Sequence, residues 1–204
     1  QVSMPGEAVS ANKFLLASRP CDWSADVLIG ALEKTTIQNL SSTINVALPA
    51  KLSIDQRNTI AAWLNNGINA LAKAYGFLPV KNFRILVLPT GPNEEVVPWG
   101  QVMRGGGDSI HLYVDETKSL RELDADWVLV HELSHLLHPY LSSTDSWLAD
   151  GIASYYQNVL RARGGLSSAE QAWRKLHAGF QRGLKQFDSR MTLQKDTRKL
   201  MQER

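Results

Sequence analysis

The 204-residue chain lacks several features that would assign it to a specialised class of protein. Its single cysteine, Cys21, excludes an internal disulfide and a structural zinc site built from thiolates. No apolar run approaches the roughly 18 to 20 residues that span a bilayer, so we expect no transmembrane segment. Internal repeats and low-complexity segments are also missing from the sequence. What remains is the ordinary composition of a globular protein, 44% hydrophobic and 21% charged.

The net charge and the first residues of the chain exclude few further classes of protein. The formal net charge of +2 is too small to indicate a nucleic-acid partner, and basic and acidic residues alternate towards the C-terminus. The first residues lack the basic start and apolar core of a signal peptide, and the chain begins with Gln1 rather than Met. A processed secreted protein and a trimmed chain would both begin in this way.

The hydrophobic pattern of the first half of the chain predicts three strands and one helix. Alternating apolar residues indicate strands at 40–48 and 109–114, and a compact apolar run indicates a strand at 83–88. A Gly- and Pro-rich loop is expected between the last two strands. Residues 53–75 carry apolar side chains at helical spacing, with Ser53 as a suitable N-cap.

The second half of the chain has a helical pattern throughout. We expect helices near 119–138, 145–163 and 167–186, with two glycines separating the last two. Strands followed by helices are typical of an α+β protein. We expect residues 1–204 to form one domain with three parts: a strand-rich part at 13–118, a helical part at 119–187 and a charged tail at 188–204.

The most informative segment is His131-Glu132-Leu133-Ser134-His135, an HExxH motif. Residues four apart on a helix differ by about 40° around the axis, so His131 and His135 project from one face. Two neutral imidazoles beside an open coordination position suit zinc. Glu132 lies next to this pair, where it can take a proton from the attacking water. The apolar residues 127–130 predict that this helix enters a core, where His and Glu need a partner such as a metal.

A zinc site with two histidines needs a third protein ligand, and Asp150 is the first candidate. A helix at 145–163 that turned back against the motif helix would bring this carboxylate to the histidines; the alternative is an exposed acid or a partner for an arginine. His138 competes for the same role from nearly the same face, although three ligands along one straight helix cannot surround an ion tetrahedrally. Ser154, one turn after Asp150, could support a ligand through a hydrogen bond.

These segments resemble those of a known group of enzymes. The HELSH helix, followed by WLADGIASYY and an Arg-Ala-Arg-Gly-Gly-Leu turn, resembles the gluzincin metallopeptidases, most closely the M61 glycyl aminopeptidase-like family. The match runs from about Trp99 to Gly183 and is dense only between His131 and Leu166. The resemblance implies a zincin-like α+β fold, with a small mixed or antiparallel sheet lobe, a helical lobe and a zinc cleft between them. It also implies that the two motif histidines and the acid at position 150 bind zinc, with Glu132 as the general base.

The resemblance further implies an extended substrate peptide bound along an edge strand preceded by glycines. The residues in that role would be Gly105, Gly106, Gly107, Ser109 and His111, although a plain flexible loop is the alternative for the glycines. Tyr155 and Tyr156 are candidates for stabilising the oxyanion that forms at the substrate carbonyl. Because neighbouring residues on a helix point about 100° apart, at most one of these two rings faces the cleft, and packing is the alternative role.

Two departures from the family pattern shape the functional prediction. The family has Glu where this chain has Asp150, and only 14 residues separate His135 from Asp150. The sequence predicts a zinc peptidase that acts on a peptide or protein substrate, and the family resemblance favours a secreted or periplasmic location. A catalytically impaired, peptidase-like binding domain is the first alternative. A metal-free structural protein with an accidental HExxH motif is the second.

Overall fold

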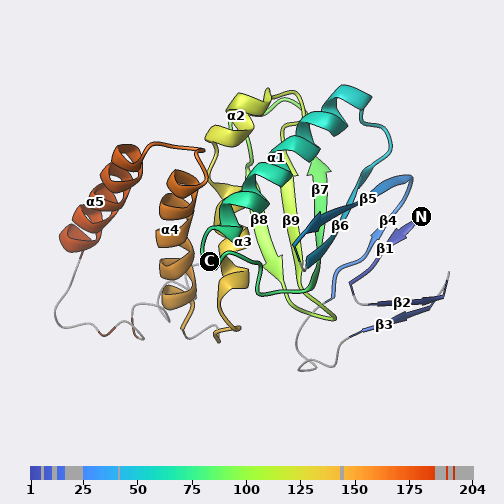
Figure 1. Cartoon of the computed structure of the whole chain (residues 1–204), viewed down its shortest axis with the longest axis horizontal. Helices are drawn as coiled ribbons and strands as arrows, with labels where there is room; N and C mark the ends of the chain where they lie inside the picture. The colour runs from blue at the N-terminus through green and yellow to red at the C-terminus, as the bar shows by residue number, and fades with distance from the viewer. Residues whose placement is uncertain are drawn as a thin grey trace.

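A computed structural model of the chain describes residues 1–5, 7–10, 13–16, 25–40, 42–142, 145–186, 192 and 195. Its main feature is a mixed five-stranded sheet in the order β5-β6-β7-β9-β8 (Figure 1). The sheet strands are β5 (Leu32–Asn39), β6 (Ser42–Pro49), β7 (Asn82–Pro89), β8 (Trp99–Met103) and β9 (Ser109–Val114). The three central strands run parallel, and β5 and β8 are antiparallel at the two edges. This arrangement confirms the expected α+β class with a mixed sheet.

The three predicted strands are present, and two edge strands were not predicted. Strands β6, β7 and β9 follow the predicted ranges closely, except that Leu40 lies in the turn before β6. β5 was missed because its sequence is mostly polar and only Leu32 is buried. β8 occupies part of the region expected to be a Gly- and Pro-rich loop, so that expectation is wrong for residues 99–103.

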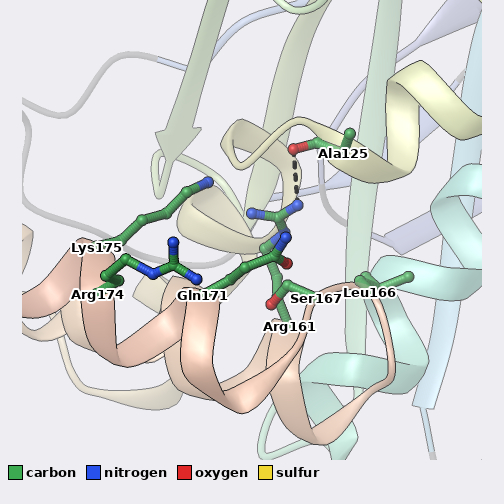
Figure 2. A pocket seen from close by; sticks show the side chains of 7 residues that line it. All are labelled: Ala125, Arg161, Leu166, Ser167, Gln171, Arg174 and Lys175. Carbon is green, nitrogen blue, oxygen red and sulfur yellow. Dashed lines mark hydrogen bonds between the residues drawn. The ribbon is translucent and has the colours of Figure 1, made fainter.

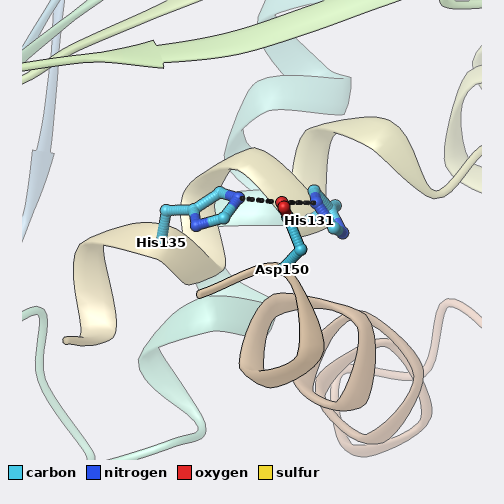
Figure 3. Close-up of side chains that lie close together, drawn as sticks. All are labelled: His131, His135 and Asp150. Atoms are coloured by element: carbon cyan, nitrogen blue, oxygen red, sulfur yellow. Dashed lines mark ion pairs between the residues drawn. The ribbon is translucent and has the colours of Figure 1, made fainter. Parts of the chain in front are cut away.

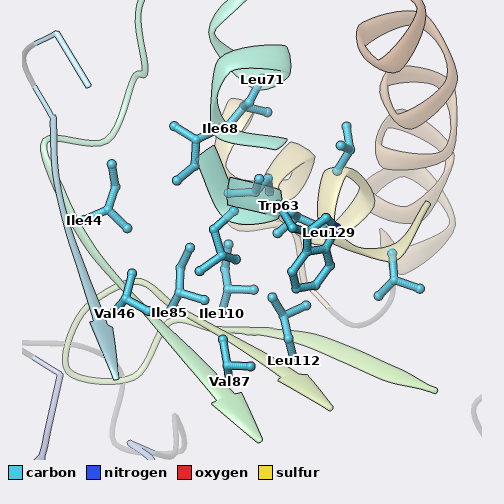
Figure 4. Packing of buried hydrophobic residues seen from close by; sticks show 14 of the residues in the cluster. Ile44, Val46, Trp63, Ile68, Leu71, Ile85, Val87, Ile110, Leu112 and Leu129 are labelled. Atoms are coloured by element: carbon cyan, nitrogen blue, oxygen red, sulfur yellow. The ribbon is translucent and has the colours of Figure 1, made fainter. Parts of the chain in front are cut away.

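Helix α1 (Ile54–Ala72) covers one face of the sheet and completes the main core (Figure 4). Its start is fixed as predicted, because Ser53 and Gln56 form a reciprocal capping box. Trp63, Leu64 and Ile68 of this helix are at most 2% exposed. They belong to one buried cluster with apolar side chains from β6, β7 and β9, among them Ile44, Ile85 and Ile110.

The helix expected at 119–138 is divided into three short elements. They are α2 (Leu120–Ala125), α3 (Val128–Ser134) and the 3-10 turn η1 (His135–Leu137). The first break occurs because Asp126 has an extended backbone, with ψ of 155°, and its carboxylate accepts the N–H of Val128. The second element is buried on all sides, and the last ends at His138, whose backbone is extended before Pro139.

Helices α4 (Ser146–Arg163) and α5 (Ala169–Gln186) confirm the last two predicted helices. In Figure 1 they lie beyond α3, on the side of the molecule away from the N-terminal strands. None of the helices in the described residues is long and apolar enough to cross a membrane. Of the charged tail predicted at 188–204, only residues 192 and 195 fall within the described part, and Cys21 also lies outside it.

The beginning of the chain lies partly against the opposite face of the sheet. It contains β1 (Val2–Ser3), β2 (Glu7–Ser10), β3 (Lys13–Leu15) and β4 (Leu28–Ile29), with β1 paired to β4 and β2 to β3. Arg84 of β7 is only 5% exposed and donates hydrogen bonds to the carbonyl oxygens of Ser3 and Asp26. The N-terminal segment is therefore attached to the sheet through a buried guanidinium.

A buried carboxylate fixes the loop that leads into β8. Asp115, just after β9, is 1% exposed and accepts hydrogen bonds from the backbone N–H groups of Asn93 and Thr117. Burial raises the pKa of Asp115, but these bonds, one from the Thr117 hydroxyl and the charge of Lys118 more than offset it, so the net pKa is lowered. The ionised carboxylate thus stabilises the folded loop.

Candidate metal centre

The motif helix and α4 bring three donor side chains together, as Figure 3 shows. His131 and His135 project from α3 and the start of η1, and Asp150 projects from the second turn of α4. The Oδ1 atom of Asp150 lies 3.9 Å from Nε2 of His131 and 3.7 Å from Nε2 of His135. All three donor atoms lie within 4.8 Å of one another.

These distances are slightly longer than those between the ligands of a bound zinc ion. In a tetrahedral site with bonds of about 2.0 to 2.2 Å, neighbouring ligand atoms are roughly 3.3 to 3.6 Å apart. The separations of 3.7 and 3.9 Å from Asp150 are close to that range. The Asp150 side chain is 62% exposed, so the group reaches solvent on one side, as a site with an open coordination position needs.

Both histidines are held in the neutral form that binds metals. Burial lowers the pKa of His131, against opposing effects of its hydrogen bond with Gln157 and the charge of Asp150. Burial lowers the pKa of His135 to about 3, helped by the nearby His131, His138 and Arg104. A neutral imidazole keeps a nitrogen lone pair for a metal, so neither histidine has to lose a proton first at neutral pH.

Glu132 lies on the side of α3 that faces the edge strand β8. Its side chain is 8% exposed. Burial and the charge of Asp150 raise its pKa to about 7, against a smaller lowering by the backbone N–H of Val102. An added Cβ on Gly100 would lie 2.7 Å from Cγ and 3.1 Å from Oε1 of Glu132. Only glycine at position 100 leaves room for the carboxylate where it stands.

The residue that supports His131 is Gln157, which the sequence analysis did not identify. Its Oε1 atom lies 2.6 Å from Nδ1 of His131, so Nδ1 donates while Nε2 faces Asp150. Gln157 follows Asp150 by two helical turns and therefore shares its face of α4. Ser154, expected in this role, is exposed, and the Gln157 contact replaces that expectation. The sequence signal that could have identified this contact is a glutamine two helical turns after Asp150.

His138 lies outside the group of three donors. Its Nδ1 atom lies 2.8 Å from the carbonyl oxygen of Pro139, and its extended backbone takes it off the helix. Arg104 donates to the carbonyl oxygens of both His135 and His138, which fixes this turn. The geometry therefore favours Asp150 over His138 as the third candidate ligand.

The two tyrosines lie away from the donor atoms. Tyr156 packs against the main core, and burial raises its pKa, with Tyr75 beside it. Tyr155 is 43% exposed, and its ring lies 5.5 Å from that of Tyr156. Within the described part of the chain, no contact joins either ring to the candidate ligands. Packing against the core accounts for the position of Tyr156, and a catalytic role for either tyrosine stays a prediction.

The expectation that Ser109–His111 form an edge strand of the sheet is wrong. Strand β9 lies between β7 and β8, so its backbone is already paired on both sides. Ser109 and His111 are buried on the face that carries the N-terminal segment, where they hydrogen-bond each other and lie near Arg84 and Asp26. The edge position was implied by the family resemblance, whereas strand order depends on tertiary pairing that the sequence does not reveal.

Of the three glycines before β9, Gly106 faces the N-terminal segment. Gly105 and Gly106 are buried, and an added Cβ on Gly106 would meet Pro5, Leu16 and Ala25. Gly106 has a φ of 72° and Gly107 a φ of 142°, so both form a turn that disfavours other residues. These glycines shape the turn between β8 and β9 rather than a substrate-binding edge.

Comparison with known proteins places this geometry in context. Neither the known sequence families nor the curated proteins contain a match to this chain. Among solved structures, an aminopeptidase N family protein from Idiomarina loihiensis matches with a TM-score of 0.51 and 14% identity, over 84% of this chain and 32% of that one. A variant of an M1 zinc metallopeptidase from Deinococcus radiodurans matches with a TM-score of 0.51 and 15% identity, over 89% of this chain and 42% of that one. The fold resembles that of M1 zinc metallopeptidases.

The likeness to these structures is limited in chain length and in sequence identity. The chain spans less than half the length of these proteins, and at such low identity the likeness concerns the fold alone. A second structure of the Deinococcus radiodurans variant, with a TM-score of 0.51, 16% identity and the same coverage of 89% and 42%, contains a Tyr-Ser-Ala substrate. The similarity is to gluzincin-type zinc peptidases of the M1 family; it does not single out M61.

Proposed function

We propose that this chain is a zinc-dependent peptidase that hydrolyses peptide bonds. The observation that carries the proposal is the convergence of two neutral imidazoles and one carboxylate at separations suited to zinc, next to a buried glutamate. The fold likeness to M1 zinc metallopeptidases supports it, as does the tripeptide bound to one of them. The segment Trp147–Gly151 and the tyrosine pair after it support an M61-like variant of the gluzincin site.

In this proposal, His131, His135 and Asp150 hold the ion. A zinc ion bound there supplies Lewis-acid polarisation of the scissile carbonyl and lowers the pKa of water. Glu132 accepts the proton of the attacking water and then passes it to the leaving amine. Burial of this carboxylate raises its pKa above the ordinary value, the direction that favours a group acting as a base and then as an acid. Gln157 keeps the His131 ring in the tautomer that offers Nε2 to the ion.

Strand β8 is the element we propose for holding the substrate, in place of β9. It is the edge of the sheet on the side of α3, and Gly100 brings its backbone against Glu132. An extended peptide can pair with the backbone of an exposed edge strand without strict side-chain specificity. Substrate held along β8 would therefore pass close to the proposed base.

The alternative of an impaired binding domain rests on Asp150, which replaces the Glu of the family. The shorter side chain would argue for lost activity only if its carboxylate failed to reach the histidines. Its Oδ1 atom lies within 3.9 Å of both Nε2 atoms, so the shorter acid is compensated by the position of α4. We therefore favour an active site.

The decisive test is the Glu132→Gln variant, assayed with a library of unblocked and blocked peptides after zinc loading. We expect full zinc content and a rate of cleavage lower by about 10²- to 10⁴-fold, since only proton transfer is removed. Glu94→Gln, on an exposed loop, is the matched control and should cleave like the parent. Undiminished cleavage by Glu132→Gln would refute the mechanism. A zinc-loaded parent that cleaves no peptide would favour the binding domain.

A further inference from the structure

A cavity with several basic residues in its lining lies away from the candidate metal centre. It has a volume of about 340 Å³ and opens between the end of α2, the end of α4 and the first turns of α5 (Figure 2). Arg161 in its wall follows Asp150 by eleven residues on α4, which is about 16 Å along a helix axis. The cavity is therefore separate from the proposed zinc site and large enough for a small organic molecule.

The lining of this cavity is cationic. Arg161, Arg174 and Lys175 contribute to it, together with the neutral polar residues Ser167 and Gln171. Figure 2 shows the side chains of Gln171, Arg174 and Lys175 rising from α5 towards the guanidinium of Arg161. Among the described residues that line the cavity there is no carboxylate. An anion would meet attraction from several directions and no repulsion from the lining.

Arg161 is a buried cation without an acidic partner in contact. Its residue is 3% exposed, and Nη2 donates to the carbonyl oxygens of Asp124 (2.9 Å) and Ala125 (2.7 Å). Its Nε atom has no hydrogen-bond partner within the part of the chain that is described. Buried arginines are normally paired with an anion, because an uncompensated charge in a low-dielectric interior is costly.

The nearest carboxylates are directed elsewhere. Both oxygens of Asp124 accept from Nδ2 of Asn66, at 2.9 and 3.2 Å. Asp126 accepts the backbone N–H of Val128 at 2.7 Å, and so fixes the start of α3. These groups attract Arg161 through space, but in the described residues neither comes within ion-pair distance of it. Among the described residues, the guanidinium is thus held in place by carbonyl oxygens and has no carboxylate within ion-pair distance.

The cavity wall is fixed by the turn between α4 and α5. The N–H groups of Leu166 and Ser167 both donate to the carbonyl oxygen of Arg161, and Gly165 has a φ of 80° that favours glycine. Ser168 then caps α5 through a reciprocal pair of hydrogen bonds with Gln171. The backbone of the turn and the side chain of Gln171 are therefore held in place before any ligand arrives, which lowers that part of the entropic cost of binding.

We propose that this cavity binds a small oxyanion, a molecule bearing a phosphate or carboxylate group. Arg161 provides the fixed charge at the base, and Lys175 and Arg174 close around the ligand from α5. The planar guanidinium suits the oxygen geometry of both groups, and lysine adds a mobile point charge. Arg174 now pairs with Glu170 at 3.0 Å on the exposed surface, where such a pair is weak enough to exchange for a ligand.

The proposal is tested by thermal unfolding and calorimetric titration of the zinc-loaded chain with inorganic phosphate and, separately, with succinate. Chloride keeps the ionic strength constant. We expect saturable binding of at least one anion, an affinity about tenfold lower in Lys175→Gln, and no saturation in the Arg174→Gln/Lys175→Gln double variant. Lys185→Gln, exposed on the same helix, is the matched control and should bind like the parent.

The two anions distinguish the phosphate and carboxylate classes of ligand. Lack of saturable binding by either one would overturn the proposal. Equal binding by the parent, Lys175→Gln and the double variant would overturn it as well, since that result assigns the anion to the zinc ion or to general charge screening. Because these readouts do not depend on cleavage, they also separate this proposal from the proposed peptidase activity.

Discussion

A methyl group added at Gly100 tests how β8 holds the proposed catalytic base. Gly100 lies opposite Leu112 in the sheet, with its α-carbon against α3. An added Cβ would lie 2.5 Å from Cγ1 of Val128 and 2.7 Å from Cγ of Glu132. Carbon atoms prefer separations of about 3.5 to 4.0 Å, so β8 and α3 must move apart by roughly 1 Å.

The size of the effect follows from this displacement. Overpacking of a filled interior costs about 1 to 3 kcal/mol of folding free energy. For a chain of this size, that corresponds to a fall in Tm of roughly 2 to 12 °C. A shift of about 1 Å in a catalytic group can lower a rate about 10²-fold. Zinc content should be unchanged, because the atoms nearest to the added Cβ belong to Val128 and Glu132 and not to a candidate ligand.

The measurements are the Tm, the zinc content and the rate of peptide cleavage of Gly100→Ala. Gly183→Ala is the control, because a Cβ there meets nothing within 4 Å and α5 should gain about 0.5 to 1 kcal/mol of stability. An unchanged Tm in Gly100→Ala would refute the packing of β8 against α3. A lowered Tm with undiminished cleavage would refute the role of this contact in placing Glu132.

Three further predictions concern the support of the site and of the sheet. Gln157→Leu should weaken zinc binding about 10- to 100-fold in a chelator competition, whereas Gln157→Glu keeps an acceptor for His131 and should not. Asp115→Asn should lower the free energy of unfolding by about 1 to 3 kcal/mol at neutral pH. The pKa of Asp115 is lowered in the folded state, so the difference in unfolding free energy should persist at every pH above an ordinary carboxyl pKa of about 3.9. It should vanish when urea unfolding is repeated at lower pH. A difference that stays constant with pH would contradict this prediction. Arg84→Met should speed amide exchange in residues 1–5 while β7 stays protected, and unchanged exchange there would argue against attachment by this side chain.

The elements that could be predicted from the sequence are those with a strong local signal. Helices α1, α4 and α5 have long apolar periodicity, β6 and β9 have alternating apolar residues, and β7 is a compact apolar run. The missed strands β5 and β8 lie at the sheet edges, where one side of the backbone is unpaired and polar residues are tolerated. The break at Asp126 depends on one backbone angle, which helical spacing does not report.

The candidate site shows the same division between local and tertiary information. The spacing of His131, Glu132 and His135 within one helix is sufficient to group them. The approach of Asp150 was expected from the family resemblance and from a turn between two helices, and the structure brings it to the histidines. Gly100 could not be found in this way, because its contact with Glu132 depends on the position of an edge strand distant in sequence.

The most direct test of the central claim is the zinc content per chain, measured by elemental analysis on the parent and on Asp150→Ala, His135→Ala and His138→Ala. The geometry predicts about one zinc per chain in the parent and in His138→Ala, and loss of zinc in the other two variants. Zinc that survives in Asp150→Ala, or disappears in His138→Ala, would contradict the proposed ligand set. A parent that binds no zinc even after reconstitution would contradict the metal centre itself.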